Sequence, residues 1–377
     1  MRRRRFLDLA YVLIAALPLL AGFAAYWLIV FVDPYGVRPW GKGIHLDGQW
    51  VADRERPLLV DNSLRQPHDL VLFGASTTMA VSNRMLQDAY GARTPLNISF
   101  IAPRPVDYGE VLSRIETAPA LKRVVLVMDF TLLDRSSLKS TAGFDRHNLQ
   151  STSWSHGGDF SLDAAQTSLS LLFGPPQPTL VLDPGRRPEF MSGGTAVTQS
   201  AATMRRFVTA VEKQRQGVFG GTPPGCDSFP FIAQRLVPFV RQMHARHVPV
   251  DVVFPAYPYV LYYDWTQNLP RFGILRPGGV FVQLMSFKRC VVTALRPYLG
   301  SGTAVVAPDS DDALSGDLHN YMDSGHLLSD SSYETFVHMA AQRNVSLTER
   351  NLDAYEASLR KKIAAAGSRL LTQTQSH

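Results

Sequence analysis

Short apolar runs that alternate with amphipathic segments constrain the fold of this 377-residue chain more than any other feature. Residues 70–73 (Leu-Val-Leu-Phe) and 124–128 (Val-Val-Leu-Val-Met) are continuous runs, typical of strands buried on both faces. Further strands are predicted over residues 96–100, 248–254 and 303–307, and helices over residues 78–90, 106–118, 232–247 and 280–299. The alternation predicts an α/β fold: a three-layer, doubly wound parallel sheet covered by helices on both faces.

The N-terminus predicts a membrane anchor. After Arg2 to Arg5, the run from Leu9 to Val32 contains no charged residue and ends at Asp33. A helix of about 24 residues is roughly 36 Å long, enough to cross a hydrocarbon core of about 30 Å. The run exceeds the apolar region of a cleavable signal peptide, although Leu20 to Ala24 could be read as a cleavage site. Because cationic residues stay on the cytoplasmic side, we expect a single-pass inner-membrane protein whose C-terminal domain is periplasmic or extracellular.

The domain organisation follows from the same features. Residues 1–34 are interpreted as the cytoplasmic arginine cluster and transmembrane helix, and residues 35–350 as the exported domain. Residues 131–231, rich in Ser, Gly, Pro and Asp, interrupt the alternation and are interpreted as an insertion or cap on the sheet. Ser331 and Glu334 form an S-x-x-E pattern that predicts the start of the last strong helix of that domain. Residues 351–377 are interpreted as a polar C-terminal helix and tail.

Charge and cysteine content exclude several classes of function. Arg2 to Arg5 supply four of the six net positive charges, so no nucleic-acid-binding surface is indicated. Cys226 and Cys290 lack C-x-x-C spacing; in an exported domain they could pair or remain two buried thiols. His244 and His247 lie at i, i+3 spacing without an evident third ligand, which predicts no metal site. The glycines between residues 217 and 225 follow no strand and lead into Pro223-Pro224, which argues against a phosphate-binding loop, and no cofactor is predicted.

Two short segments carry candidate chemistry. Ser76, in Gly74-Ala75-Ser76-Thr77, follows the first strand, where a parallel sheet binds its ligands. Gly74 permits a tight turn there, although Ser76 and Thr77 could also simply cap the following helix. Asp323-Ser324-Gly325-His326 precedes the last helix, where an aspartate can orient a histidine base toward a serine nucleophile. Ser76, Asp323 and His326 therefore form a candidate catalytic triad.

These residues resemble the SGNH (GDSL-like) hydrolase superfamily, which has a G-x-S turn after the first strand and D-x-x-H before the last helix. With the single anchor, the insertion and Asn97 in Leu96-Asn97-Ile98-Ser99, the chain is similar to one branch in particular. That branch contains the alginate O-acetylation proteins and the D-alanine-transfer protein of teichoic acid synthesis. The resemblance covers most of residues 65–345 and implies a flavodoxin-like sheet, an acyl-ester reaction and an oxyanion or substrate-binding group that includes Gly74 and Asn97.

The sequence departs from the superfamily pattern at three positions. Ala75 replaces the usual aspartate between the glycine and the serine. The second oxyanion glycine is absent after the second strand, so its donor would be the N–H of Ala102, since Pro103 has none. Asp129 stands where the pattern has G-x-N-D, and an ionised carboxylate cannot donate a hydrogen bond.

Aromatic residues follow the fourth strand directly. They are candidates for stacking on sugar rings at the carboxyl edge of the sheet, and packing beneath the cap would explain them equally well. The substrate-binding candidates among them are Tyr257, Tyr259, Tyr262 and Trp265.

The sequence therefore predicts a membrane-anchored serine enzyme that transfers or removes an acyl group on an extracellular or cell-surface polysaccharide, in exopolysaccharide biosynthesis. An integral-membrane acyltransferase or polysaccharide synthase complex is the expected partner, because the acyl donor is cytoplasmic. Two alternatives remain: a non-catalytic assembly or carbohydrate-binding subunit, and a lipase-type esterase.

Overall fold

The computed structural model describes residues 2–32, 60, 63–64, 66–99, 103, 105–133, 162–173, 201–268, 279–322 and 325–375. Its chain forms two compact units. One comprises Met1–Ser63 and Ala142–Leu182, and the other comprises Leu64–Thr141 and Asp183–His377. The second unit contains the sheet. Residues 183–231 of the segment interpreted as an insertion belong to this unit, and residues 142–182 group with the N-terminus.

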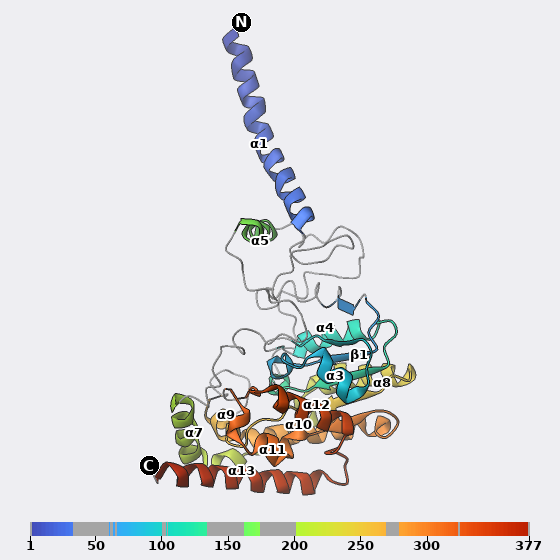
Figure 1. Ribbon diagram of the computed structural model, residues 1–377, viewed down its shortest axis with the longest axis vertical. Helices are drawn as coiled ribbons and strands as arrows, with labels where there is room; N and C mark the ends of the chain where they lie inside the picture. The colour runs from blue at the N-terminus through green and yellow to red at the C-terminus, as the bar shows by residue number, and fades with distance from the viewer. Residues whose placement is uncertain are drawn as a thin grey trace. The chain divides into compact units, whose positions relative to one another are not determined.

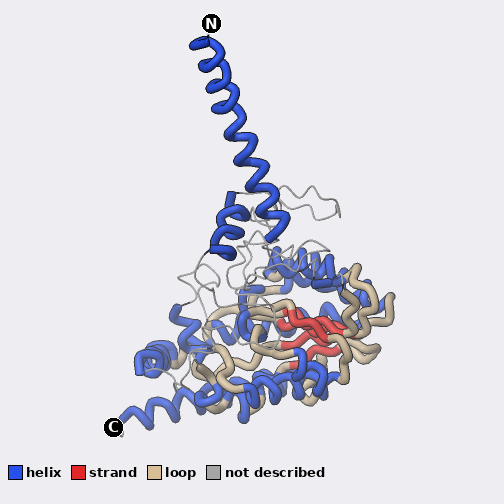
Figure 2. Tube along the Cα trace, turned by 45° about the horizontal axis from the view of Figure 1, so that its top comes forward, coloured by secondary structure: helices blue, strands red, loops and turns tan. Residues whose placement is uncertain are grey.

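A five-stranded parallel sheet forms the centre of the second unit, which confirms the α/β class (Figure 2). The strands are β1 (Leu70–Phe73), β2 (Pro95–Asn97), β3 (Arg123–Val127), β4 (Val250–Val253) and β5 (Ala304–Val306). Their spatial order is β2-β1-β3-β4-β5, and every neighbouring pair is parallel. The chain thus leaves β1 toward one edge and returns at β3 on its other side. In such sheets, ligands bind at the carboxyl ends of the strands beside this reversal.

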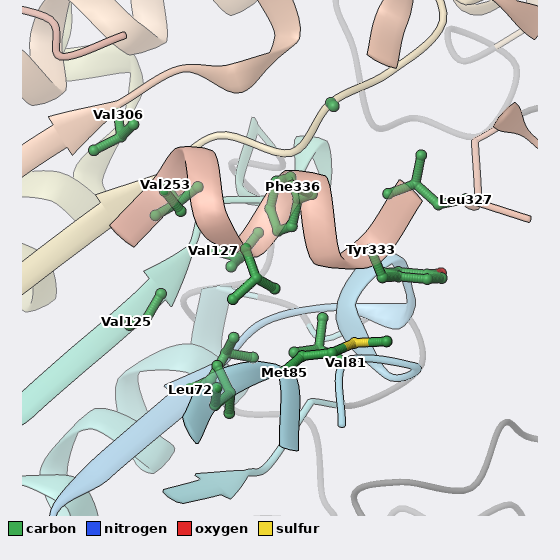
Figure 3. Close-up of a cluster of buried hydrophobic side chains, with 14 of the residues drawn as sticks. Leu72, Val81, Met85, Val125, Val127, Val253, Val306, Leu327, Tyr333 and Phe336 are labelled. Atoms are coloured by element: carbon green, nitrogen blue, oxygen red, sulfur yellow. The ribbon is translucent and has the colours of Figure 1, made fainter. Parts of the chain in front are cut away.

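Helices cover both faces of the sheet because successive side chains of each strand point to opposite sides. On one face, Leu72 of β1 and Val127 of β3 pack with Met85 of α3 (Asn83–Tyr90) and Phe336 of α12 (Asp330–Gln342) (Figure 3). The other face lies against α4 (Pro105–Ile115), α8 (Val237–Ala245) and α10 (Val280–Leu295), which Figure 1 labels. There the Phe73 ring lies 4.6 Å from that of Tyr108 in α4.

Two helix starts differ from the sequence prediction. The expected helix over residues 78–90 is divided into a 3₁₀ turn, η1 (Ser76–Thr78), and α3, because the Ser82 side chain accepts a hydrogen bond from the Met85 N–H and caps a new helix. Helix α12 is capped by Ser329, whose hydroxyl accepts from the Ser332 N–H, so the prediction of a capping box at Ser331 is wrong. Ser329 has the extended backbone of an N-cap, and Ser331 already lies inside the first turn.

The C-terminal helix α13 (Leu352–Gln375) is an integral part of the second unit. Leu352, Leu359 and Ile363 are buried along it. Tyr355 donates a hydrogen bond of 2.6 Å to Asp309 in η9 (Pro308–Ser310), and the buried Lys288 of α10 pairs with the same carboxylate. The described residues of this unit also form α7 (Ala201–Gln214), α9 (Leu261–Asn268) and the short α11 (Asp312–Ser315).

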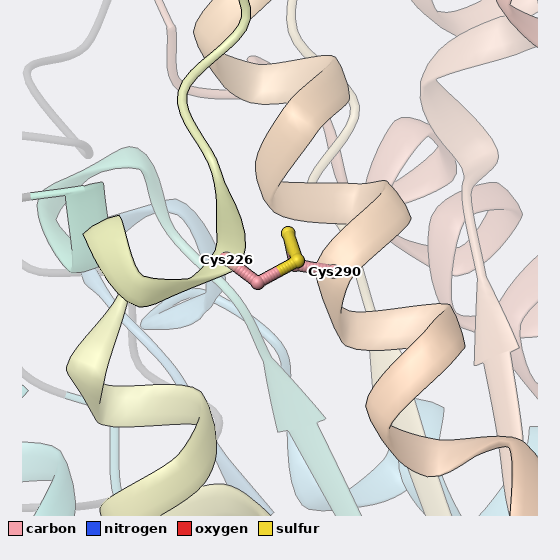
Figure 4. The surroundings of a disulfide bond; sticks show 2 residues. All are labelled: Cys226 and Cys290. Atoms are coloured by element: carbon pink, nitrogen blue, oxygen red, sulfur yellow. A yellow bond between two sulfur atoms is a disulfide. The ribbon is translucent and has the colours of Figure 1, made fainter.

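A disulfide joins Cys226, in the turn η5 (Cys226–Ser228), to Cys290 in α10 (Figure 4). The sequence left open whether these cysteines pair, and the structure contains the bond. It closes a loop between residues 64 positions apart, linking the segment before α8 to the helix that covers the sheet.

Among the described residues of the first unit, the helices α1 (Arg2–Val32) and α5 (Leu162–Phe173) contact each other. The side chains of α1 that the structure describes include strongly exposed apolar residues such as Phe23 and Phe31. In the described part of the chain, no helix combines the length and hydropathy required of a membrane span.

Candidate active site

Ser76 and His326 lie in hydrogen-bonding contact. The distance between Ser76 Oγ and His326 Nε2 is 2.9 Å, and the two residues are 250 positions apart in sequence. Both are half-buried, which leaves the pair partly accessible to solvent. Ser76 begins η1 three residues beyond the carboxyl end of β1. The structure therefore brings together two of the three residues that the sequence singled out for nucleophilic catalysis.

A small antiparallel bridge holds His326 in place. Tyr321 pairs with Leu327, and the Met322 N–H donates to the His326 carbonyl at 3.0 Å. Tyr321 is fully buried, and its hydroxyl donates to the carbonyl of Ala256, three residues beyond β4. These bonds attach residues 321–327, which carry His326, to the carboxyl edge of the sheet. The imidazole is therefore held close to the segment after β1.

A buried hydrogen-bond network centred on Asn97 positions residues 74–81, the segment after β1 that carries Ser76 and is here called the serine loop. The Asn97 amide donates two hydrogen bonds of 2.8 Å, to the carbonyls of Thr78 and Val81. Its side-chain oxygen accepts from the Ser99 N–H and hydroxyl, and Ser99 in turn bonds the Thr78 hydroxyl at 2.8 Å. Both amide hydrogens are committed, so none is left for an oxyanion. Asn97 has a positioning role here, which differs from the oxyanion or substrate-binding role expected from the sequence.

Gly74 allows the serine loop to lie against β3. A Cβ at this position would overlap the Thr78 hydroxyl and lie only 2.9 Å from the Val127 Cβ. Gly74 itself is buried. Glycine is therefore required because the chain packs closely beneath Ser76. The sequence analysis instead placed Gly74 among the groups that bind the oxyanion or the substrate.

Asp129, just beyond β3, adds a buried carboxylate beside the pair. It is 2% exposed and accepts hydrogen bonds from the Tyr257 hydroxyl at 2.7 Å and the Thr131 N–H at 3.1 Å. Burial raises the pKa of Asp129, while the hydrogen bonds from Tyr257 and Thr131 and the charge of nearby His326 act to lower it. The sequence identified Asp129 only as an unsuitable oxyanion donor. Its position after the strand next to β1 is the signal that could have marked it as a neighbour of the histidine.

The aromatic candidates after β4 are core residues. Tyr257, Tyr259, Tyr262 and Trp265 are 4%, 1%, 1% and 7% exposed, which corrects the expectation that they form a carbohydrate-stacking surface. Each tyrosine hydroxyl donates to a carboxylate of the protein: Asp129 for Tyr257, Asp312 for Tyr259 and Asp309 for Tyr262. The Trp265 ring lies 4.6 Å from the rings of both Tyr257 and Phe130. No ring face of this set is available to a substrate.

Two predicted site residues, Asp323 and Ala102, lie outside the described residues. Within the described residues, no group of three potential metal-ligating side chains is present. His244 instead packs against the Tyr298 ring and contacts the Ser301 hydroxyl through Nδ1.

No protein-family model matches the chain, and no curated protein matches it either. With a proton on Nδ1, the His326 Nε2 can accept the Ser76 proton, and Asp129 provides negative charge nearby. This arrangement can activate a serine hydroxyl as a nucleophile.

Proposed function

We propose that this protein is a serine acyl-ester enzyme that uses Ser76 as nucleophile and His326 as general base. The observation that carries the proposal is the distance of 2.9 Å between Ser76 Oγ and His326 Nε2 at the carboxyl edge of the sheet, beside the reversal in strand order. A nucleophile and a base within hydrogen-bonding reach, contributed by loops far apart in sequence, are the minimal requirement for serine catalysis.

In the proposed reaction, His326 removes the Ser76 proton while Oγ attacks the acyl carbonyl of an ester. The tetrahedral intermediate collapses as the bond to the leaving alkoxide breaks, and the imidazolium returns its proton to that oxygen. The acyl-enzyme is then attacked by a sugar hydroxyl or by water, whose proton passes to His326. The bond between the acyl carbon and Ser76 Oγ breaks, and the imidazolium returns the proton to Oγ, which regenerates the serine. Asp323 orients the imidazole in this scheme, and Asp129 adds negative charge that favours the imidazolium.

The strand order β2-β1-β3-β4-β5, with Ser76 after β1 and His326 before α12, supports membership of the SGNH-like superfamily. That order is the flavodoxin-like arrangement of a doubly wound sheet. We infer the membrane-anchored, polymer-acylating branch from the features that resemble it, namely the single N-terminal anchor, the insertion, Asn97 and Asp323.

Export and anchorage are part of the proposal. The disulfide between Cys226 and Cys290 supports an oxidising compartment, because such bonds are rare in the cytosol. The uncharged run from Leu9 to Val32 behind Arg2–Arg5, together with exposed apolar side chains on α1, supports a single span with the second unit on the outer side of the inner membrane. The polysaccharide acceptor and an integral-membrane acyltransferase partner follow from the resemblance and from this topology.

Acyl-enzyme formation tests the activity directly. The full chain in detergent is incubated with p-nitrophenyl acetate and digested, and the peptide containing Ser76 is weighed by mass spectrometry. A mass increase of one acetyl group on this peptide, absent from Ser76→Ala and strongly reduced in His326→Ala, is expected. Acetylation elsewhere, or equal acetylation of the Ser76→Ala chain, would disprove the assignment.

A non-catalytic subunit that retains the fold is the second candidate. It is favoured by one observation: the Asn97 amide is fully used within the loop and Asp129 is a carboxylate, so neither is free to donate to an oxyanion. Cells that carry only Ser76→Ala and still acylate their polymer fully would support this alternative. Efficient turnover of long-chain esters would instead indicate a lipase-type esterase.

A further inference from the structure

In the described part of the chain, the large hydrophobic side chains that are exposed all lie in the first unit. The large hydrophobic residues that are exposed are Leu17, Leu19, Leu20, Phe23, Tyr26, Trp27 and Phe31 on α1, and Leu169, Leu172 and Phe173 on α5. The described residues of the second unit contain none of this kind. Large apolar surfaces that remain exposed in a folded protein mark contacts with membranes or other proteins.

Helix α5 differs from α1 in length. It has 12 residues, about 18 Å of helix, which is too short to cross a hydrocarbon core of about 30 Å. Its exposed large hydrophobic residues lie in its C-terminal half, where Phe173 is 81% exposed, while Ala165 and Ser168 are buried. A short helix with such an end can enter a bilayer only partially, at the boundary between headgroups and acyl chains.

The contact between the two helices supplies the second observation. α5 packs against α1 within one compact unit, although about 130 residues separate the two helices in sequence. Any surface that holds α1 therefore lies close to α5. Both helices of the contacting pair therefore carry exposed large hydrophobic side chains.

We propose that α5 is a second membrane contact, which inserts Leu169, Leu172 and Phe173 into the outer interface of the bilayer that α1 spans. This inference rests on the proposed membrane anchorage of α1. Three side chains on a free helix would bind a bilayer weakly and reversibly. Because α1 tethers the helix at the surface, its local concentration is high and a weak contact is sufficient.

The bilayer is favoured over a second copy of the chain because the exposed residues of α5 adjoin a helix with exposed apolar side chains of its own. A protein partner would require a complementary face, and the described residues of the second unit offer no exposed large hydrophobic residue to a second copy. The membrane anchor would then consist of two helices, α1 and α5, rather than of α1 alone.

Depth-dependent fluorescence quenching tests the contact in the full chain. Because the two native cysteines are paired, a single introduced cysteine is the only free thiol and can be labelled with the environment-sensitive fluorophore NBD. Phe173→Cys reports on α5, with Leu169→Cys as a second α5 position. Leu20→Cys reports on α1, and Ala364→Cys, an exposed position on α13, is the matched control. Each chain is reconstituted into phosphatidylcholine–phosphatidylglycerol vesicles that contain lipids with a nitroxide at carbon 5 or carbon 12.

We expect the labels at 173 and 169 to be quenched several-fold more strongly than the label at 364, and more by the shallow nitroxide than by the deep one. The label at 20 should be quenched most by the deep nitroxide. Quenching at 20 without quenching at 173 and 169 would overturn the α5 contact and leave the anchor intact. No quenching at any position would overturn the anchor and this inference together. Oxidative cross-linking of the unlabelled Phe173→Cys chain between copies, without quenching of the labelled one, would assign the face to a second copy.

Discussion

Two segments follow strands at the carboxyl edge of the same sheet and are used in opposite ways. The segment Gly74–Thr78 after β1 presents a half-buried serine that contacts His326. The segment Tyr257–Trp265 after β4 is buried throughout, and its tyrosine hydroxyls all donate to groups of the protein, three to carboxylates and that of Tyr263 to the Ile363 carbonyl. A place at the ligand-binding edge is therefore not sufficient for a role in binding. What decides is whether the polar groups of the segment find partners inside the protein.

The largest expected effect is at the serine segment. Ser76→Ala and His326→Ala should each lower acyl transfer by about 10³-fold or more, because the nucleophile and the base act as one unit. The double variant should be little worse than either single variant. Rates are measured with p-nitrophenyl acetate, and thermal unfolding should be unchanged in Ser76→Ala, whose hydroxyl is half-buried and bonded to the imidazole. Additive losses in the double variant would separate the two residues and contradict the pair.

Substitutions in the aromatic segment should act on stability instead. Trp265→Ala and Tyr262→Ala each remove a buried ring and should lower the free energy of unfolding by about 3–5 kcal/mol. Activity toward small and polymeric substrates should then decline together, in step with the melting temperature. Tyr262→Phe is the matched control, since it removes only the hydroxyl bonded to Asp309 and should cost about 1 kcal/mol. A selective loss of polymer binding at an unchanged melting temperature would restore the carbohydrate-groove interpretation.

Asn97 shares a feature with each of the two segments: it is buried like the aromatic residues, and it supports the loop that carries Ser76. Asn97→Ala leaves the Thr78 and Val81 carbonyls and the Ser99 donors without their partner, and should cost about 2–3 kcal/mol of stability. The rate with p-nitrophenyl acetate should decline as well, since the loop that carries Ser76 loses its support. Asn97→Asp retains the acceptor and loses both donors, so it should resemble Asn97→Ala. A loss of rate with unchanged stability would show that the amide acts on the substrate.

The parts of the molecule that the sequence predicts are those specified locally. The apolar runs at 70–73 and 124–128 identify buried strands, and the turn after the first of them places Ser76 at the correct edge. The burial of Tyr259 and Tyr262 and the partners of their hydroxyl groups could not be predicted in this way. Their acceptors, Asp312 and Asp309, lie about 50 residues further along the chain and come into reach only when the fold forms. The prediction that Ser331 caps α12 is wrong because Ser329 and Ser331 are both suitable N-caps, and only the backbone conformation selects Ser329.

The smallest effect is expected at Asp129, which contacts both segments. It is buried beside His326 and bonded to Tyr257 of the aromatic segment. Burial raises the pKa of Asp129 above its ordinary value. The unfolded chain then releases this proton at lower pH than the folded chain, so stability falls as the pH rises from the ordinary pKa to the folded-state pKa, and the full penalty remains above it. The penalty vanishes below the ordinary pKa, where both states are protonated.

Asp129→Asn should therefore raise the free energy of unfolding by about 1 kcal/mol at pH 8, with the gain disappearing toward pH 4. The same change should lower acyl transfer by about tenfold, since the carboxylate no longer offsets the charge that His326 gains when it accepts the Ser76 proton. Asp264→Asn is the matched control: this aspartate is also buried, with its pKa raised by burial, and it pairs with Arg206. It should leave acyl transfer unchanged. Equal losses of activity in both variants would mean that Asp129 contributes only to packing, and the buried carboxylate would then belong with the aromatic core rather than with the serine segment.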